Sequence, residues 1–541
     1  MRVGIGQINS SIGAIEANAD AIIERIGEAR AAGCDLVVFP EMAVPGYAPL
    51  DLIWRPGFVD ACEATVDRIR ASSGGIGVLV GSIIAKPRQE AINRFDLSSL
   101  SDGAQVDLFN VAVLIDDANV LARAAKMHLP CYDVYDEKRY LEPSPGIEVT
   151  AFRGLTLGLN VCEDLWVSEG PTELQASLGA DWIVNLSASP FYVGKPAIRR
   201  RLVSRRAREN GVGIVYVNRI GGQDDVVYDG GSMVADAEGR FLFQAPHFGE
   251  GLYVVDLDHA PPVPESIDDD VAQIRAALTL GIRDYVRKSG FSSVLLGLSG
   301  GIDSALVCTL AAEALGPEAV TAVYLPSRFS SDASGEDARA LAERLGVEYL
   351  EISIDEVHRA LRGALPEKAE GLVDENLQPR ARGALLMAIA NARGALVLCP
   401  GNKAEIALGY NTLYGDTVGA LAPISDLYKS DVYRLARSFG DRIPARILDK
   451  PPSAELRPDQ RDDDDMPPYA LLDPILRELI ERNASRAQLI DRGFDEAAVD
   501  EALRRYYTSE YKRQQLPPGI KVTPKAFGIG RRVPITHSYR D

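Results

Sequence analysis

The chain of 541 residues is 46% hydrophobic and 25% charged, as in globular proteins of roughly two to four domains. Its formal net charge of −19 excludes a broad nucleic-acid-binding surface, because such a surface needs a basic footprint. The six cysteines are scattered without a Cys-x-x-Cys pair, and no signal peptide or apolar run of about 18 residues is present, so we expect a cytoplasmic protein without disulfides, zinc or a membrane span.

Residues 1–258 alternate short apolar runs with helical segments, which predicts one α/β domain whose sheets are covered by helices. A helix is predicted over 14–32, because Gly33 is a residue type that commonly ends helices. Residues 232–244 predict a β-hairpin. The other predicted strands are 3–5, 35–39, 77–84, 110–115, 155–161, 182–186 and 213–218.

Glu41 and Cys162 each end a predicted strand, and Lys126 lies between them in the sequence. A glutamate can accept the thiol proton of a cysteine, while a lysine and the backbone N–H of Glu163 can stabilise a developing oxyanion. Taken singly, these residues are more commonly a turn carboxylate, a surface lysine and an inert buried thiol. His128 remains an alternative base, because Cys–His pairs are the commoner cysteine chemistry.

In this order, the three residues resemble the Glu-Lys-Cys triad of the nitrilase superfamily, and the resemblance covers residues 1–258. It implies an αββα sandwich that hydrolyses or transfers amides through a thioester. The basic run 199–208 is expected to be a solvated or intersubunit helix face. The glutamine-binding residues that the resemblance implies are Tyr132, Glu137, Ser189 and Lys195.

A Pro-rich stretch at 259–270 predicts a linker, and a second α/β domain is expected over 271–541. A helix is predicted over 271–288. Strands separated by long helices indicate a doubly wound parallel sheet, which binds ligands at the carboxyl ends of its strands. The predicted strands of this domain are 294–298, 319–325, 348–352 and 395–399.

The first of these strands leads into the Gly-rich turn Ser-Gly-Gly-Ile-Asp-Ser at 299–304, which opens a helix. Glycines let backbone N–H groups approach an anion, and the helix N-terminus adds further donors. The turn lacks the lysine of a Walker A loop, and it resembles the pyrophosphate loop of N-type ATP pyrophosphatases. The predicted ATP-binding residues are Ser299, Gly300, Gly301, Ile302, Asp303, Ser304, Arg328 and Arg380.

Asp303 and Glu405 are candidate Mg²⁺ ligands, because carboxylate oxygens can hold this metal against a triphosphate. Asp426 and Lys429 add a carboxylate and an ammonium to the same domain. The acidic segment 462–465 is expected to be a solvated loop, which could order near bound nucleotide.

The stretches Gly-Asn-Lys-Ala-Glu (401–405), Tyr-Gly-Asp (414–416), Arg-Ala-Arg (380–382) and the tail 512–528 resemble NAD⁺ synthetases. Together with the nitrilase-like half, the whole chain resembles the glutamine-dependent NAD⁺ synthetase family. That family adenylates deamido-NAD⁺ and lets ammonia from glutamine displace AMP, and its synthetase domains pair as a homodimer. The residues that the resemblance implies at deamido-NAD⁺ are Asn376, Arg382, Asp416, Lys429 and Lys512.

Two alternatives remain open from the sequence. An adenylating amidotransferase could act on a different carboxylate, although the tail and Tyr-Gly-Asp stretch argue against this. The first domain could be an inactive scaffold, which the intact Glu41, Lys126 and Cys162 disfavour.

Overall fold

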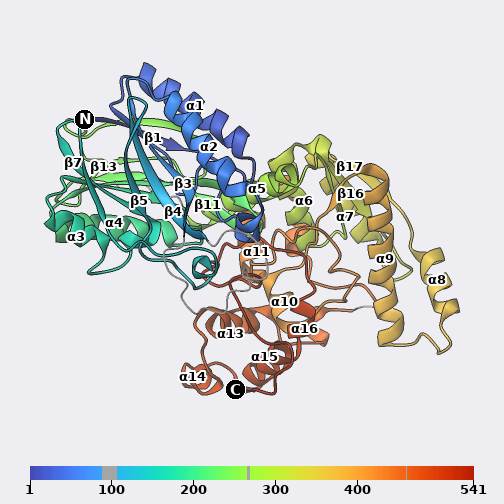
Figure 1. The fold of residues 1–541 in the computed structure, drawn as a ribbon. Coiled ribbons are helices and arrows are strands. Elements are labelled where there is room, and N and C mark those ends of the chain that lie inside the picture. Colours follow the sequence, from blue (N-terminus) through green and yellow to red (C-terminus); the bar gives the residue numbers. More distant parts are fainter. Residues whose placement is uncertain (88–105, 265–268, 459, 541) are drawn as a thin grey trace. The chain divides into compact units, whose positions relative to one another are not determined.

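The computed structural model describes residues 1–87, 106–264, 269–458 and 460–540 (Figure 1). The chain forms two compact units, Met1–Gly221 with Tyr228–Ile267, and Gly222–Val227 with Asp268–Asp541. The sequence did not indicate that the short segment Gly222–Val227 belongs to the second unit. Within that unit, the N–H of Gly222 donates to Asp284 Oδ2 at 2.8 Å. Among the described residues, no helix is both long and apolar enough to cross a membrane.

The first unit contains two six-stranded sheets. In the first sheet β1–β2 and β2–β3 are parallel, and the remaining neighbours are antiparallel. The strand order of the first sheet is β14 (Gly251–Asp256), β1 (Arg2–Gln7), β2 (Leu36–Val38), β3 (Gly77–Pro87), β4 (Val106–Asp116) and β5 (Asn119–Ala125). The second has β13 (Phe241–Gln244), β12 (Met233–Ala235), β9 (Gly213–Asn218), β8 (Trp182–Ser187), β7 (Leu155–Val161) and β6 (Glu148–Phe152).

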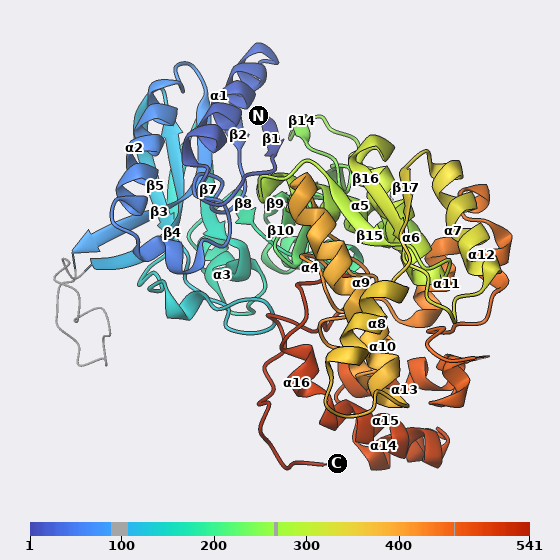
Figure 2. The ribbon, with the colours of Figure 1, turned by 90° about the vertical axis from the view of Figure 1, so that its right-hand side faces the viewer.

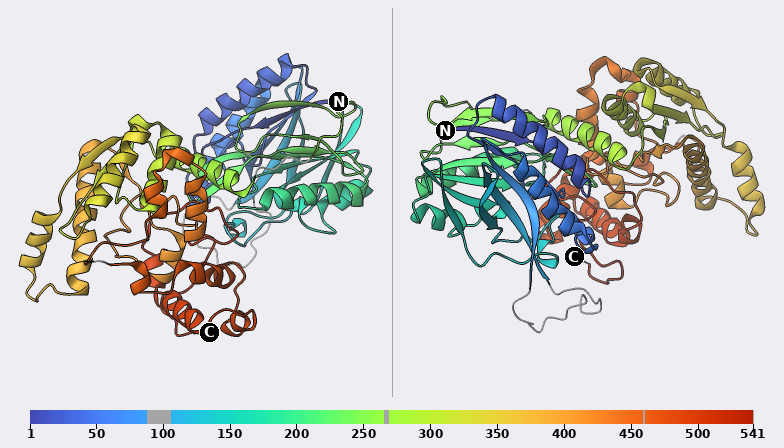
Figure 3. Two further views of the ribbon diagram at one scale, coloured as in Figure 1. Left: turned by 180° about the vertical axis from the view of Figure 1, so that it is seen from behind. Right: turned by 45° about the horizontal axis from the view of Figure 1, so that its top comes forward.

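The two sheets face each other, and helices cover their outer faces (Figure 3, left). Leu36, Leu114, Val184 and Val215 belong to one apolar cluster, which therefore joins residues of both sheets. Helices α1 (Ile15–Ala31) and α2 (Phe58–Ala71) pack on the first sheet. Helices α3 (Pro171–Ser177) and α4 (Lys195–Asn210) pack on the second. This arrangement confirms the predicted αββα sandwich.

Three strands of this unit, β5, β6 and β14, were not predicted, and all three lie at sheet edges. Edge strands keep one side open to solvent, so their sequences mix polar with apolar residues and lose the continuous apolar signal of central strands. In β5, for example, exposed positions alternate with buried ones toward its end. A short hairpin, β10 (Ile220–Gln223) and β11 (Val226–Asp229), was also not predicted.

The second unit contains a four-stranded parallel sheet, as predicted. Its order is β17 (Glu348–Glu351), β16 (Val320–Tyr324), β15 (Val294–Gly297) and β18 (Leu396–Val397). Strands β16 and β17 follow one another on one side of β15, whereas the later strand β18 lies on its other side, so the direction of strand addition reverses between β15 and β18. Because crossovers between parallel strands are right-handed, the helices before and after this reversal lie on opposite faces of the sheet. One face carries α6 (Ile302–Leu315) and α7 (Asp332–Leu345), and the other carries α9 (Leu372–Arg393) (Figure 2). A crevice for a ligand is expected at this reversal.

The remaining helices of the second unit surround this sheet or form a separate helical cluster toward the C-terminus. The cluster packs α10 against α13 and α15 through residues such as Ala407, Leu476 and Leu503. The bounds of these helices are α5 Asp270–Lys288, α8 Asp355–Ala364, α10 Lys403–Leu408, α11 Lys429–Arg437, α12 Ala445–Asp449, α13 Tyr469–Glu481, α14 Arg486–Asp491, α15 Glu496–Thr508 and α16 Glu510–Arg513.

Candidate active sites

Cys162 follows β7 directly and begins a short 3-10 turn, Cys162–Leu165. Its side chain is 2% exposed, and its backbone φ is +46°, a region that residues other than glycine rarely occupy. Such a conformation persists only where the surrounding structure holds it, and it is common at functional sites. The turn therefore fixes a buried thiol at a strand end.

Glu41 follows β2 and is 1% exposed. Its Oε1 accepts hydrogen bonds from Asn110 Nδ2 at 2.6 Å and from Lys126 Nζ at 2.7 Å. Its Oε2 accepts the backbone N–H of Ala188 at 2.9 Å. Both oxygens of this buried carboxylate are thus held by donors, which fixes the carboxylate in position.

Lys126 follows β5 and is fully buried between two carboxylates. Its Nζ also donates to Glu137 Oε1 at 2.8 Å, and the Tyr47 hydroxyl donates to the same oxygen at 2.6 Å. Burial alone would lower the pKa of Lys126, but Glu137 and Glu41 raise it well above its usual range. Burial raises the pKa of Glu137 to about 7 against the opposing effect of Lys126. The lysine is therefore a persistent cation in this site.

Burial and the nearby Glu41 raise the pKa of the Cys162 thiol well above its usual value, while Lys126 and the N–H of Ala188 act in the opposite direction. A thiol in this setting stays protonated at neutral pH, so a base must remove its proton before it can attack a carbonyl. Glu41 can act as that base, and Lys126 carries the positive charge that an oxyanion would require. The structure brings the three predicted residues together.

Two of the predicted glutamine-binding residues, Tyr132 and Lys195, lie near the same thiol. Cys162 contributes to the electrostatic environment of both Tyr132 and Lys195. The Tyr132 hydroxyl donates to Glu163 at 2.9 Å, and Lys195 Nζ lies 4.0 Å from the centre of the Trp166 ring. Burial, followed by the charge of Arg199, lowers the pKa of Lys195 to about 8.

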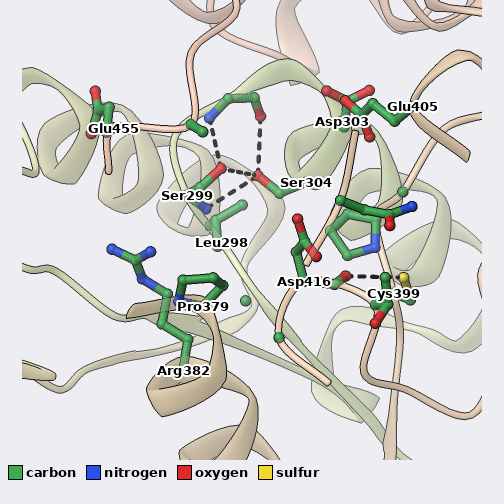
Figure 4. A pocket seen from close by; sticks show the side chains of 18 of the residues that line it. Leu298, Ser299, Asp303, Ser304, Pro379, Arg382, Cys399, Glu405, Asp416 and Glu455 are labelled. Atoms are coloured by element: carbon green, nitrogen blue, oxygen red, sulfur yellow. Dashed lines mark hydrogen bonds between the residues drawn. The ribbon is translucent and has the colours of Figure 1, made fainter. Parts of the chain in front are cut away.

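In the second unit, the predicted pyrophosphate loop connects β15 to α6. Ser304 Oγ accepts the N–H of Ser299 at 3.1 Å and donates to the carbonyl of Gly301, also at 3.1 Å (Figure 4). Gly300 has φ of +77°, and a Cβ there would lie 2.4 Å from the carbonyl oxygen of Ser334. Only glycine therefore fits at this point of the loop.

A cavity of about 300 Å³ opens at the carboxyl ends of β15 and β18, where the strand order reverses. Figure 4 shows Asp303 and Glu405 close together on one side of it, with Arg382 and Asp416 on other walls. Burial raises the pKa of Asp416 to about 6 against the N–H of Thr412 and the charges of Lys512 and Arg382. The predicted site residues that line the cavity are Ser299, Gly301, Ile302, Asp303, Ser304, Arg382, Glu405, Asp416 and Lys429.

The other predicted residues of this site lie outside the cavity lining, and each has a protein partner. Arg328 Nη2 contacts Asp374 Oδ2 at 3.2 Å, and Arg380 Nε donates to the carbonyl of Leu413 at 3.2 Å. Gly300 lies against the backbone of Ser334. Asn376 Oδ1 accepts the Thr412 hydroxyl at 2.7 Å, and Lys512 Nζ donates to the carbonyls of Gly409 and Asn411, both at 2.7 Å.

Asp303 and Glu405 have the chemistry of a magnesium site. Lys429 Nζ lies 2.5 Å from Asp303 Oδ2 and 3.6 Å from Glu405 Oε1, so its ammonium already offsets both carboxylates. Burial and the neighbouring Asp303 raise the pKa of Glu405 to about 8. A divalent cation would relieve this repulsion, and the two carboxylates therefore fit Mg²⁺.

Comparisons with known proteins match both halves of the chain. A carbon–nitrogen hydrolase family model matches residues 2–260, and an NAD synthase model matches residues 274–516. A glutamine-dependent NAD⁺ synthetase of Synechocystis sp. is 40% identical to this chain, covering 99% of each protein, and one of Xylella fastidiosa is 40% identical, covering 100% of this chain and 99% of the relative. The chain belongs to the glutamine-dependent NAD⁺ synthetase family.

A solved structure of another member of the glutamine-dependent NAD⁺ synthetase family, from Acinetobacter baumannii, contains adenosine diphosphate. It is 35% identical to this chain, covers 99% of this chain and 98% of its own, and has a TM-score of 0.75.

In this NAD⁺ synthetase family member, the alternative base His128 contacts Asp164. Its Nδ1 lies 3.2 Å from Asp164 Oδ1, which raises the pKa of the imidazole. The His128 imidazole is thus paired with a carboxylate, whereas Glu41 is one of the charged groups that act on the pKa of the Cys162 thiol.

The expectation of a solvated face for 199–208 is wrong at its first two arginines. Arg199 is fully buried and forms an ion pair with Asp229, and Arg200 is buried with its guanidinium 3.8 Å from the centre of the Phe241 ring. Helix α4 packs on the second sheet, so some of its arginines must face inward, where carboxylates and rings satisfy them.

The acidic segment 462–465 also differs from its expected solvated loop. Asp462 is 5% exposed, lines the cavity, and accepts the Tyr469 hydroxyl at 3.4 Å, whereas Asp463 and Asp464 are exposed. Residues Asp462–Asp464 form a 3-10 turn. Sequence composition alone does not distinguish the one inward carboxylate from its neighbours.

The sequence suggests that Asp426 acts together with Lys429, but in the structure Asp426 has other partners. It pairs with the fully buried Lys403 at 2.8 Å and accepts the N–H groups of Val522 and Thr523, both at 2.7 Å. Lys403 Nζ also donates to the Thr523 hydroxyl at 2.7 Å. This buried pair anchors the C-terminal segment, part of which lines the cavity through Leu516 and Pro517.

Proposed function

We propose that the protein forms NAD⁺ from deamido-NAD⁺, ATP and glutamine. The observation that carries this proposal is the presence, in one chain, of a buried Glu-Lys-Cys constellation and of a cavity lined by a Gly-rich loop and by two neighbouring carboxylates, Asp303 and Glu405. Relatives that match over their full length and are named glutamine-dependent NAD⁺ synthetase support NAD⁺ formation over amidation of another carboxylate.

In the first unit, Glu41 takes the proton of Cys162, and the thiolate attacks the amide carbonyl of glutamine. Lys126 stabilises the oxyanion that forms, with the N–H of Glu163 as a second donor. Glu41 returns the proton to the leaving nitrogen, which departs as ammonia and leaves a thioester. Water then attacks the thioester with Glu41 as base, releasing glutamate and the thiol.

We assign the contacts with glutamine to Tyr132, Glu137, Ser189 and Lys195. Lys195 can pair with the α-carboxylate of the substrate, because its ammonium lies near the thiol, against the rings of Trp166 and Tyr192. Glu137 acts mainly through Lys126, whose ammonium it holds at 2.8 Å.

In the second unit, the carboxylate of the nicotinate ring attacks the α-phosphorus of ATP, and pyrophosphate leaves. Ammonia then attacks the acyl-adenylate and displaces AMP. The loop at 299–304 receives the pyrophosphate, and Asp303 and Glu405 would hold Mg²⁺, which neutralises phosphate charge when bound. Asp416 and Lys429 face the cavity from positions suited to the nicotinate-bearing substrate.

Four residues outside the cavity lining are also assigned to substrate binding. Their side chains would reach the substrates by moving or by contacting them at the rim of the cavity. Arg328 and Arg380 would exchange their present partners for ATP phosphates. Asn376 and Lys512 would contact deamido-NAD⁺; Lys512 already interacts with the cavity residue Asp416.

We also propose a cytoplasmic homodimer built on the synthetase domains. Helix α9 supports this, since it exposes 71% of Leu372, 48% of Val373 and 39% of Met387. Sedimentation analysis of the full chain tests it, and a monomer at micromolar concentration would contradict it.

Product analysis tests the whole proposal. The protein is incubated with ATP, deamido-NAD⁺, Mg²⁺ and either glutamine or ammonium. We expect NAD⁺, AMP and pyrophosphate in equal amounts with both donors, and glutamate with glutamine alone. Stoichiometric ADP, or no NAD⁺ with either donor, would refute the assignment.

A further inference from the structure

Asp164, two residues after the reactive cysteine, has a carboxylate that binds two separate segments of the first unit. Its side chain is buried, at 1% exposure. Oδ2 accepts the N–H of Val161 at 3.2 Å, immediately before Cys162. Oδ1 accepts the N–H groups of Met127 and His128 at 3.1 and 2.9 Å, immediately after Lys126.

These bonds connect the backbone just before Cys162 with the backbone just after Lys126. Lys126 itself is held upstream by its N–H, which donates to the carbonyl of Asn110 at 2.8 Å. Downstream, Asp164 is the acceptor for the next two N–H groups. One carboxylate therefore holds the backbone next to both the lysine and the cysteine.

The Asp164 carboxylate also binds next to the unusual backbone conformation of Cys162. A φ of +46° must be held by the surroundings, and Asp164 binds the turn at its entry. Arg206 holds the other end, donating to the carbonyls of Leu165 and Trp166 at 3.1 and 2.9 Å. The thiol is thus presented by a turn that is fixed at both ends.

Resting on the proposed glutaminase function of this unit, we propose that Asp164 is a positioning residue that sets the placement of the Cys162 thiol relative to the Lys126 ammonium. It does not touch the substrate. Its carboxylate accepts backbone N–H groups from the end of the strand before Cys162 and from the residues after Lys126. An asparagine at this position would direct its NH₂ group, which is a donor, at one of these N–H donors.

The test compares Asp164→Asn with wild type and with Asp181→Asn. Asp181 Oδ2 accepts the N–H of Thr156 at 2.8 Å, near the opposite end of β7, so the control removes a similar bond away from the cysteine. Glutaminase kcat and KM are measured, together with the rate at which iodoacetamide alkylates Cys162 across a pH series, read by mass spectrometry. NAD⁺ formation from ammonium reports the second site.

We expect Asp164→Asn to lower glutaminase kcat about 10²-fold, the order of loss for a displacement of about 1 Å, with a smaller change in KM for glutamine. Alkylation should shift to higher pH, because a thiol farther from Lys126 loses part of the charge that stabilises its thiolate. Ammonium-dependent NAD⁺ formation and the Asp181→Asn protein should match wild type.

A folded Asp164→Asn protein with wild-type kcat and an unchanged alkylation profile would overturn the proposal. If that variant does not fold, Asp164→Glu, which keeps the charge, is used instead, and the same two outcomes decide. Loss of folding in both variants would also overturn it, because the residue would then act on stability alone. Alkylation needs no glutaminase turnover, so an inactive wild-type enzyme would refute the proposed function without obscuring this test.

Discussion

Replacing Glu41 by glutamine tests the proposed base while keeping the shape of its side chain. In the structure, Oε1 accepts Asn110 Nδ2 and Lys126 Nζ at 2.6 and 2.7 Å, and Oε2 accepts the N–H of Ala188 at 2.9 Å. Both carboxylate oxygens therefore face donors. The amide NH₂ of glutamine must point at one of these donors in either orientation, and it cannot accept the thiol proton.

The expected magnitudes follow from these contacts. A buried donor that loses its acceptor costs about 1–3 kcal/mol, so the free energy of unfolding of the first unit should fall by that order. Losing the general base should lower glutaminase kcat by about 10²–10⁴-fold. NAD⁺ formation from ammonium should stay unchanged, because Glu41 has no part in adenylation.

The assays are glutamate release at saturating glutamine, NAD⁺ formation from ammonium, and urea unfolding followed by circular dichroism. Glu63→Gln is a matched control, since Glu63 Oε1 also accepts a backbone N–H, that of Ala85 at 3.1 Å, but lies on the surface. A Glu41→Gln protein with wild-type glutaminase kcat would refute the reasoning. If His128→Ala were the inactivating change instead, a Cys–His mechanism would replace it.

The remaining predictions concern the nucleophile, the cation site and the buried anchor. Cys162→Ala should abolish glutamine-dependent NAD⁺ formation but keep the ammonium-dependent reaction, whose rate should rise with pH as ammonium loses its proton; normal glutamine use by the folded variant would disprove the nucleophile. Asp303→Ala and Glu405→Ala should each abolish adenylation with either nitrogen donor, measured as AMP release, and wild-type activity at limiting Mg²⁺ would exclude that residue as a ligand. Lys403→Met should lower the free energy of unfolding of the second unit by about 3–5 kcal/mol, because it leaves the carboxylate of Asp426 buried and unpaired; urea unfolding with an unchanged midpoint would contradict this.

The sequence alone determined the central strands and the loops that follow them. Buried strands such as β8 and β15 have continuous apolar runs, and Gly-rich turns have local steric requirements, so both leave a signal within a few residues. The αββα sandwich, the parallel sheet and the triad Glu41, Lys126 and Cys162 were accessible in this way, the triad through its resemblance to a known family.

Which charged residues point inward depends on the tertiary structure and could not be predicted from the sequence. Arg199, Lys403 and Asp462 lie within runs or motifs of charged residues, and their burial depends on partners far away in the sequence, such as Asp229 and Asp426 for the first two. The same holds for the edge strand β14, which pairs with β1 from the other end of the first unit's sequence. A polar side chain is buried only where the fold supplies a partner to offset its desolvation, and a local sequence pattern does not contain that partner.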